Sequence, residues 1–193
     1  MRALSMPEPR DPPLERETPL VFAEIYERAF PWVWRAARRL GVDSSLVDDV
    51  VQDVFIVVHR KLSTFEGRSS LRSWIYGITL RVVRDRRRSA RRKPECAIED
   101  DTVIADPSRD PQRDALRREA LDTLLRILDR LPEDQREVFV LAELEELTVP
   151  EIADAISTNP NTVYSRLRVA RKAFEAEAAR VRARERFEEG SAQ

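Results

Sequence analysis

None of the residue patterns in this sequence is typical of catalysis, whereas several are typical of binding. The chain has a single histidine, His59, and a single cysteine, Cys96. A zinc site or an intrachain disulfide needs more such residues than these. The sequence also lacks a glycine-rich phosphate loop and a nucleophile placed beside a base. We therefore expect no cofactor, no metal and no enzymatic activity, and the prediction of function depends on the binding patterns.

A dense basic segment at residues 81–93 is a strong candidate for nucleic-acid contact. It holds eight basic residues against one acid. Lys and Arg side chains that neutralise phosphates release counterions, which favours binding to any nucleic acid. Phe65, Trp74 and Tyr76 precede the segment, and single-strand binders combine such stacking surfaces with positive charge. The alternative is that the arginines simply form the solvated end of a helix. Trp74 falls on the apolar stripe, so it is expected to pack in the core more readily than to stack on a base.

An acidic face belongs to a helix predicted over residues 46–62. Its buried stripe is predicted to contain Val47, Val50, Val51, Val54, Phe55 and Val58, and its polar face Asp48, Asp49, Gln52 and Asp53. This face would repel DNA. Acids favour helix N-termini, so a solvated helix start is one explanation. The other is a protein partner with a basic groove.

The C-terminal part has the pattern of a helix-turn-helix. Residues 148–151, Thr-Val-Pro-Glu, form a capping box that starts a short helix, and Asn159-Pro160 starts a longer one. The second helix presents polar residues suited to base edges in the major groove, namely Asn161, Thr162, Tyr164, Ser165, Arg166 and Arg168. Arg171 and Lys172 follow one turn later, where backbone contact is expected. An ordinary helical hairpin is the alternative.

The elements that position these groups are predicted to be helical throughout, so the fold class is all-α. Apolar spacing predicts a helix over residues 20–40, with a kink or a break at Pro31. The chain divides into a disordered Pro-rich lead at 1–18, a helical domain at 19–93, an acidic linker at 94–114, a helical domain at 115–180 and a tail at 181–193. No apolar run approaches the roughly 20 residues that span a bilayer.

Two stretches resemble bacterial sigma factors of the extracytoplasmic-function (ECF) group. The first, similar to their second region, is VDDVVQDVFIVVHRKLSTFEGRSSLRSWIYGITLRVVRDRRR. The second, similar to their fourth region, is LPEDQREVFVLAELEELTVPEIADAISTNPNTVYSRLRVARKAFE. The resemblance covers about residues 20–178. It implies two small helical domains joined by a flexible linker, in a promoter-specificity subunit that binds RNA polymerase core and opens promoters.

The resemblance also implies a role for each group of residues. The acidic helix would dock on the clamp helices of the polymerase largest subunit through Asp48, Asp49, Gln52, Asp53 and Phe55. The loop and the helix after it would capture a flipped base and hold the −10 element through Thr64, Phe65, Glu66, Arg68, Ser69, Trp74, Tyr76, Arg81, Arg84, Arg87 and Arg88. The helix-turn-helix would read the −35 element and touch the polymerase flap.

Two positions depart from the family pattern, which has an Asn where this chain has Arg81 and a turn glycine where it has Ser157. The resemblance implies an anti-sigma factor as a further partner. The expected location is a bacterial cytoplasm, with attachment to the membrane through the anti-sigma factor as an option. The alternative function is a stand-alone helix-turn-helix regulator, which would leave the acidic helix and the arginine run unexplained.

Overall fold

The computed structural model describes residues 21–92 and 111–191, and all regular structure in these ranges is helical. The predicted all-α class is confirmed. The α-helices are α1 (Phe22–Arg39), α2 (Val47–Lys61), α3 (Leu71–Arg92), α4 (Pro111–Arg130), α5 (Glu133–Phe139), α6 (Val149–Ala155) and α7 (Pro160–Ser191). Short 3-10 turns at Ser44–Leu46 and Leu62–Thr64 flank α2, and a π-helical turn at Val140–Leu144 follows α5. None of these helices is long and apolar enough to cross a membrane.

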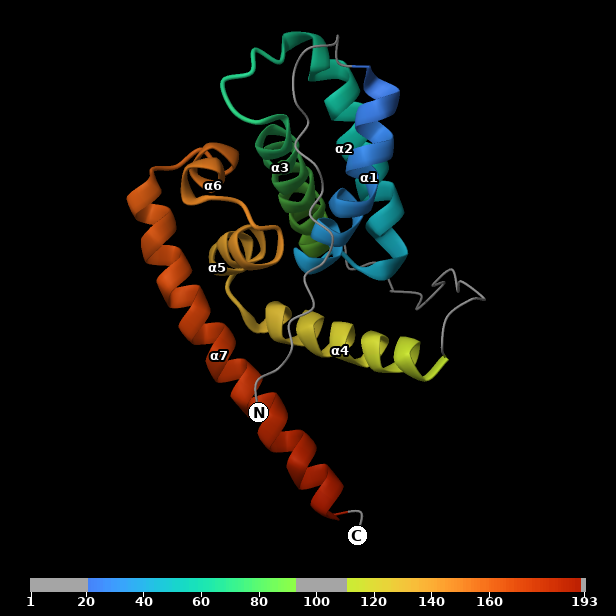
Figure 1. The fold of residues 1–193 in the computed structure, drawn as a ribbon, viewed down its shortest axis with the longest axis vertical. Helices are drawn as coiled ribbons and strands as arrows, with labels where there is room; N and C mark the ends of the chain where they lie inside the picture. The colour runs from blue at the N-terminus through green and yellow to red at the C-terminus, as the bar shows by residue number, and fades with distance from the viewer. Residues whose placement is uncertain (1–20, 93–110, 192–193) are drawn as a thin grey trace.

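Helices α1, α2 and α3 form the N-terminal domain (Figure 1). The valine-rich stretch of α2 is helical, as its length and one-sided polar residues predict, and its valines at 50, 51, 54 and 58 are at most 1% exposed. Asp43 starts this segment, because its carboxylate accepts a hydrogen bond from the Ser45 backbone at 3.0 Å. Gly41, just after α1, has φ of 88°, a conformation that favours glycine.

Helix α1 passes through Pro31 without interruption, so of the predicted kink or break, the break is wrong. Proline removes one backbone hydrogen bond and normally disrupts a helix interior. Here Ala29, Trp32 and Val33 on both sides of the proline are fully or almost fully buried. Their packing in the domain core holds the two halves of α1 in one helix despite the missing donor.

Helices α4 to α7 form the C-terminal domain. Short helices α5 and α6 lie against the first half of α7, while α7 itself continues past them and past the predicted tail boundary (Figure 1). Val138, Leu141, Ile152 and Val163 are completely buried in its core. Helix α4 begins at Pro111, inside the segment expected to be linker.

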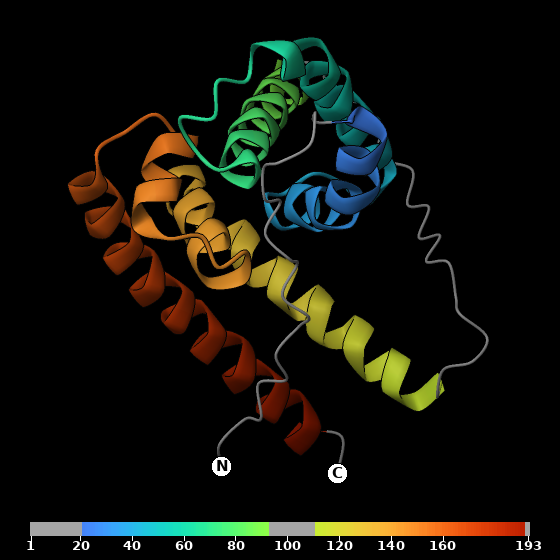
Figure 2. The ribbon, with the colours of Figure 1, turned by 45° about the horizontal axis from the view of Figure 1, so that its top comes forward.

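The two domains lie in contact, mainly where α6 packs on α3 (Figure 2). Gly77 in the middle of α3 allows this close approach. A Cβ atom at Gly77 would lie 3.0 Å from the carbonyl oxygen of Ala155 on α6. Glycine destabilises a helix interior. Its presence here is therefore explained by the close contact between the domains and not by the stability of α3.

Replacing Pro31 by alanine should stabilise the protein. The substitution restores a backbone donor inside α1, which stabilises the helix. It also gives the unfolded chain more conformational entropy, which offsets part of this gain. The free energy of unfolding should therefore rise by roughly 2 kcal/mol. Urea unfolding followed by circular dichroism measures the change. Pro150→Ala is the control, because Pro150 lies in the first turn of α6, where no donor is lost. Equal effects of the two substitutions would contradict the explanation.

Candidate protein and nucleic-acid interfaces

The acidic face of α2 lies on the outside of the N-terminal domain. Its exposed members are Asp48, Asp49 and Gln52. Asp48 accepts a hydrogen bond from the indole N–H of Trp34 at 2.9 Å, so this carboxylate is held toward α1. Asp53 forms an ion pair with Arg86 of α3 at 2.9 Å. The acidic helix and the arginine-rich end of α3 are therefore joined at this point, while the rest of the acidic face is open to solvent.

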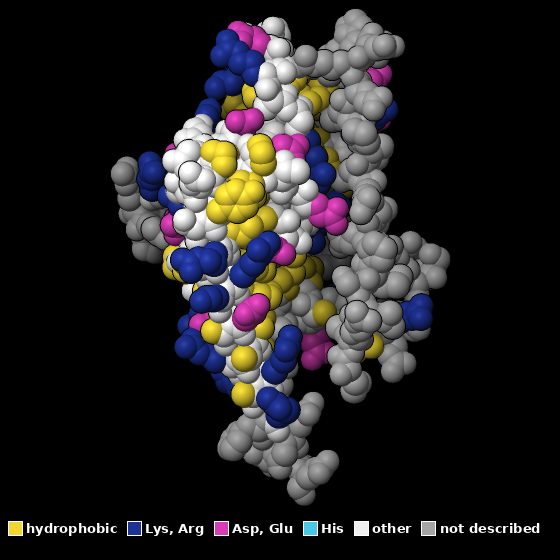
Figure 3. All heavy atoms as spheres, turned by 60° about the vertical axis from the view of Figure 1, so that its left-hand side comes forward, with side chains coloured by type: hydrophobic (Ala, Val, Ile, Leu, Met, Phe, Trp, Pro, Cys, Tyr) yellow, Lys and Arg dark blue, Asp and Glu magenta, His cyan; other side chains and the backbone are white. Residues whose placement is uncertain are grey.

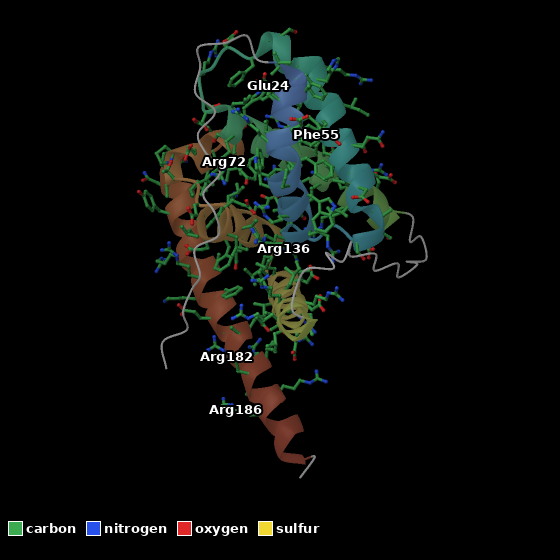
Figure 4. The ribbon with its side chains drawn as sticks, turned by 45° about the vertical axis from the view of Figure 1, so that its right-hand side comes forward. Glu24, Phe55, Arg72, Arg136, Arg182 and Arg186 are labelled. Carbon is green, nitrogen blue, oxygen red and sulfur yellow. The ribbon has the colours of Figure 1, made fainter. Side chains whose placement is uncertain are left out.

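A groove lined with aromatic side chains, here called the aromatic groove, runs beside this face. It has a volume of about 1080 Å³ and lies between α1, α2 and α4. Its apolar lining consists of Phe22, Tyr26, Phe30, Pro31, Trp34, Val47, Phe55, Ile56 and Leu121. Phe55 is only 3% exposed, with its ring 4.6 Å from that of Tyr26 (Figure 4). The predicted partner residue Phe55 thus forms part of the groove wall rather than a protruding anchor.

The aromatic groove was not among the predicted sites, although the sequence of α1 contains a signal for it. Phe22, Tyr26, Phe30 and Trp34 recur every four residues, and consecutive rings approach to 6.2 and 5.5 Å along the first three. Such spacing places side chains on one helical face. The core residues of α1 occupy a second face. Two apolar faces on one helix indicate that one of them serves a purpose other than the domain core.

The loop between α2 and α3 presents a pair of aromatic rings. Phe65 and Trp74 are both half-buried, and their centroids lie 4.9 Å apart. Gly67 turns the loop with φ of 70°. Ser70 caps α3 by accepting a hydrogen bond from the Ser73 backbone at 3.1 Å. Of the predicted polar residues of the loop, Thr64, Glu66 and Arg68 are exposed and Ser69 is half-buried.

The predicted −10 residues of α3 fall into two groups. Arg81 and Arg88 are exposed. Tyr76 is 0% exposed, and Arg84 is occupied by a bidentate ion pair with Glu137 of the C-terminal domain. In this arrangement the Tyr76 ring is inaccessible to DNA and Arg84 is engaged elsewhere. Arg87 donates to the carbonyl of residue 40 at 3.1 Å and is half-buried.

The helix-turn-helix forms as the sequence predicts. Glu151 accepts hydrogen bonds from the backbone and the hydroxyl of Thr148 at 2.9 and 2.8 Å, which completes the capping box. Asn159 caps α7 by accepting from the Thr162 backbone at 2.8 Å. Ser157 has φ of 54° and occupies the left-handed conformation for which the family pattern has glycine. The turn thus keeps the left-handed backbone conformation, although serine adopts it less readily than glycine does.

The start of α7 carries a stripe of exposed side chains, here called the reading stripe. Its members are Asn161, Tyr164, Ser165, Arg168 and Lys172. Three other predicted residues are engaged within the protein: Thr162 with Asn159, Arg166 with Asp134 at 3.6 Å, and Arg171 with Glu143 at 2.7 Å. Figure 3 turns this side forward and shows Lys and Arg side chains spread over it, with Asp and Glu between them.

The interface between the domains is made largely of buried polar groups. Buried polar residues in the described ranges are Arg39, Ser73, Thr79, Arg136, Glu137 and Glu145, and all of these except Thr79 bond across the interface. At its centre, the Glu145 carboxylate accepts from the Tyr76 hydroxyl at 2.6 Å and from Arg39 at 2.8 Å. The Glu145 carbonyl accepts from Arg72 at 3.0 Å (Figure 4). We call Glu145, Arg39, Arg72 and Tyr76 the Glu145 cluster.

Two pKa shifts follow from this interface. Burial, together with the charge of Glu145, raises the pKa of Tyr76 well above its ordinary value, so the hydroxyl remains a donor. Burial also tends to raise the pKa of Glu151, but the hydrogen bonds from Thr148 and Ser70 outweigh it and the pKa is lowered. A lowered folded-state pKa means that Glu151 stabilises the fold at neutral pH, and that this contribution is lost as acid protonates it.

Comparison with known proteins assigns both domains. Sigma-70 region 2 matches residues 25–93, and Sigma-70 region 4 matches residues 121–174. RNA polymerase sigma factor NccH of Alcaligenes xylosoxydans xylosoxydans is 32% identical over 153 residues, covering 78% of this chain and 82% of that protein. The ECF RNA polymerase sigma-E factor of Escherichia coli K12 is 32% identical over 142 residues, covering 69% and 74%. This chain belongs to the ECF group of RNA polymerase sigma factors.

Solved structures agree with this assignment of the sigma factor. CnrH in complex with the cytosolic domain of CnrY has a TM-score of 0.59 and 27% identity, covering 80% of this chain and 85% of that one. The sigma factor RpoE in complex with the anti-sigma factor NepR from Bartonella quintana has a TM-score of 0.61 at 21% identity, covering 81% and 95%, and supports the fold. The predicted family is confirmed, with its two regions in the predicted order.

Removing the Asn159 cap of α7 should destabilise this sigma factor. In Asn159→Ala the first-turn backbone N–H of Thr162 loses its acceptor, and the free energy of unfolding should fall by about 1 kcal/mol. Asn161→Ala is the matched control, since Asn161 is exposed two residues later in the same first turn and should change the free energy by less than about 0.5 kcal/mol. Urea unfolding measures both. A larger loss in the control would contradict the assigned cap.

Proposed function

We propose that this ECF sigma factor binds RNA polymerase core through the acidic face of α2 and the aromatic groove beside it. The exposed carboxylates of Asp48 and Asp49 give this surface a negative rim, and the rings of the groove give it an apolar centre. Stable protein interfaces combine an apolar centre with a polar rim of complementary charge. The polymerase surface that fits is therefore a helical ridge with basic side chains along its edge.

The reading stripe of α7 is the proposed contact with duplex DNA at the −35 element. Its residues lie on one face of the first three turns, where a recognition helix meets base edges. Asn161, Tyr164 and Ser165 come first, so they are assigned to bases. Arg168 and Lys172 follow, and are assigned to a base edge or to phosphates. Arg171, which pairs with Glu143, would need to exchange that carboxylate for a phosphate.

The loop of residues 64–70 and the basic side of α3 are the proposed contact with unwound DNA at the −10 element. Extruding a base from the duplex costs a few kcal/mol, which stacking and pocket contacts must offset. The half-buried pair of Phe65 and Trp74 offers ring surface for stacking, and Arg81 and Arg88 offer charge for phosphates. Arg81 stands where the family pattern has Asn, so we assign it to phosphate neutralisation.

The observation that carries this proposal is that one chain combines an aromatic groove with an acidic face and a helix-turn-helix whose second helix exposes polar side chains. A stand-alone regulator of duplex DNA would leave the aromatic groove and the acidic face without a role. The protein would act by binding alone, without catalysis, in the bacterial cytoplasm where polymerase works. A protein that holds it inactive, as NepR is an anti-sigma factor for its relative in Bartonella quintana, is a further proposed partner.

Charge reversal on the acidic face should weaken binding to polymerase core. Asp49→Lys and Gln52→Lys together place positive charge where a basic partner is proposed, and like charges across an interface cost several kcal/mol. Affinity in a pull-down with core polymerase should fall by roughly tenfold or more. Glu175→Lys is the control, because it reverses an exposed carboxylate on α7. Full binding by the doubly changed protein would disprove the docking surface.

Shortening Arg168 should weaken promoter binding at the −35 element. The loss expected for Arg168→Ala in the polymerase holoenzyme is about 1–3 kcal/mol, as for other arginines at base edges. Gel-shift titration on promoter DNA at fixed salt measures it. Arg180→Ala on the same helix is the control, since Arg180 pairs with Glu177 outside the reading stripe. Equal losses from both substitutions would indicate general charge attraction and contradict specific reading.

A further inference from the structure

Two exposed apolar side chains lie on the helix assigned to the −35 element. Tyr164 and Val169 of α7 are 60% and 44% exposed. Neither belongs to the core face of this helix, where Val163, Leu167 and Ala170 are at most 4% exposed. Figure 3 shows hydrophobic side chains between the Lys and Arg side chains on this side of the molecule. Packing within the protein therefore does not explain the apolar side chains at positions 164 and 169.

Tyr164 and Val169 lie on the two edges of the reading stripe. An α-helix turns by about 100° per residue, so the middle of the stripe is formed by Asn161, Ser165 and Lys172, which lie within roughly 40° of one another. Tyr164 lies roughly 80° to one side of this middle line, and Val169 roughly 60° to the other. When the stripe enters the major groove, both edges come against base pairs as well. The two apolar side chains are thus placed to contact bases.

We propose that Tyr164 and Val169 are specificity-determining residues that recognise the C5-methyl groups of thymines in the −35 element. The inference rests on the proposed function and adds the chemical group that the edges of the stripe recognise. In the major groove, thymine presents a methyl group, whereas the other bases are distinguished by their hydrogen-bond donors and acceptors. An apolar side chain is stabilised by burial against that methyl group, but burying an unpaired polar base edge against it costs free energy.

The hydroxyl of Tyr164 offers a second way to bind DNA, through a hydrogen bond to a phosphate oxygen. Such a bond would fix the position of the helix without distinguishing bases. Two observations favour the ring over the hydroxyl. Within the described part of the chain, Tyr164 forms no hydrogen bond or ring contact, so its ring surface is available. Val169 on the other edge has no polar group in its side chain, and the thymine methyl is the base group that suits both residues.

Methyl recognition also differs from charge attraction in its response to salt. Contacts of Arg168 and Lys172 with phosphates release counterions and weaken steeply as the salt concentration rises. Burial of a methyl group releases no counterions. The preference for thymine contributed by Tyr164 and Val169 should therefore be the same at low and high salt, even though the affinity for the whole promoter falls.

Replacing thymine by deoxyuridine tests the proposal, because these nucleotides differ only in the C5-methyl group. A −35 sequence selected in vitro by the wild-type polymerase holoenzyme is synthesised with each thymine replaced in turn, and gel-shift titration gives the dissociation constants. The wild type should bind roughly fourfold more weakly at each of two replaced positions, as expected for the burial of one methyl group. Tyr164→Ala should abolish this loss at one position, and Val169→Ala should abolish it at the other.

Two further variants separate the ring from the hydroxyl and from general effects. Tyr164→Phe keeps the ring, so it should retain the fourfold preference for thymine. Leu116→Ala is the matched control, because Leu116 is also 60% exposed but lies on α4, outside the reading stripe. This variant should keep the preference at both positions. Circular dichroism checks that the folds are unchanged, as expected for substitutions at exposed positions.

The outcomes separate this inference from the proposed function. If the wild-type holoenzyme selects a −35 sequence without thymine, or binds thymine and deoxyuridine equally at every position, the inference is wrong and the proposed −35 contact stands. If the preference survives in an alanine variant at both positions, or disappears in Tyr164→Phe, the role assigned to that residue is wrong. If the wild type selects no −35 sequence at all, the proposed function and the inference both fail.

Discussion

The burial of one carboxylate between two helical domains determines the arrangement of this protein. Glu145 is almost completely removed from water, so it must be surrounded by donors, and the N-terminal domain supplies them from α1 and α3. Directional bonds of this kind fix a relative orientation that apolar contact alone would leave variable. The aromatic groove depends on the same orientation, because α4 contributes one of its walls.

Helix α1 connects the functions of the N-terminal domain. One face is built into the core, a second presents the aromatic residues of the groove, and its last turn provides Arg39 for Glu145. Residues 31–39 of α1 therefore contact the core, the groove and the other domain within nine positions. This convergence explains why the helix passes through Pro31 as one unit: a break there would separate the groove from the interdomain contacts.

Local sequence rules predicted much of this structure. The capping box at residues 148–151, the Asn159 cap and the buried valines of α2 depend on neighbours within one or two turns, and each forms as predicted. The break that was one of the two predicted outcomes at Pro31 does not occur, because tertiary packing outweighs a local rule. The sequence could not predict that Glu145 is the glutamate buried between the domains, because Glu143, Glu145 and Glu146 in the sequence ELEE look equivalent. Only the docking of two domains far apart in the chain distinguishes them.

The three tryptophans of the chain lie in three different environments. Trp32 packs on Tyr76 of the Glu145 cluster with centroids 4.6 Å apart, Trp34 lines the groove and bonds to Asp48, and Trp74 contacts Phe65 in the loop between α2 and α3. Indole emission responds to nearby charges, hydrogen bonds and water. The protein therefore contains its own optical reporters, one at the interdomain contact, one in the aromatic groove and one beside the loop of residues 64–70. Single-tryptophan variants would follow changes at each of these three places in time without an added dye.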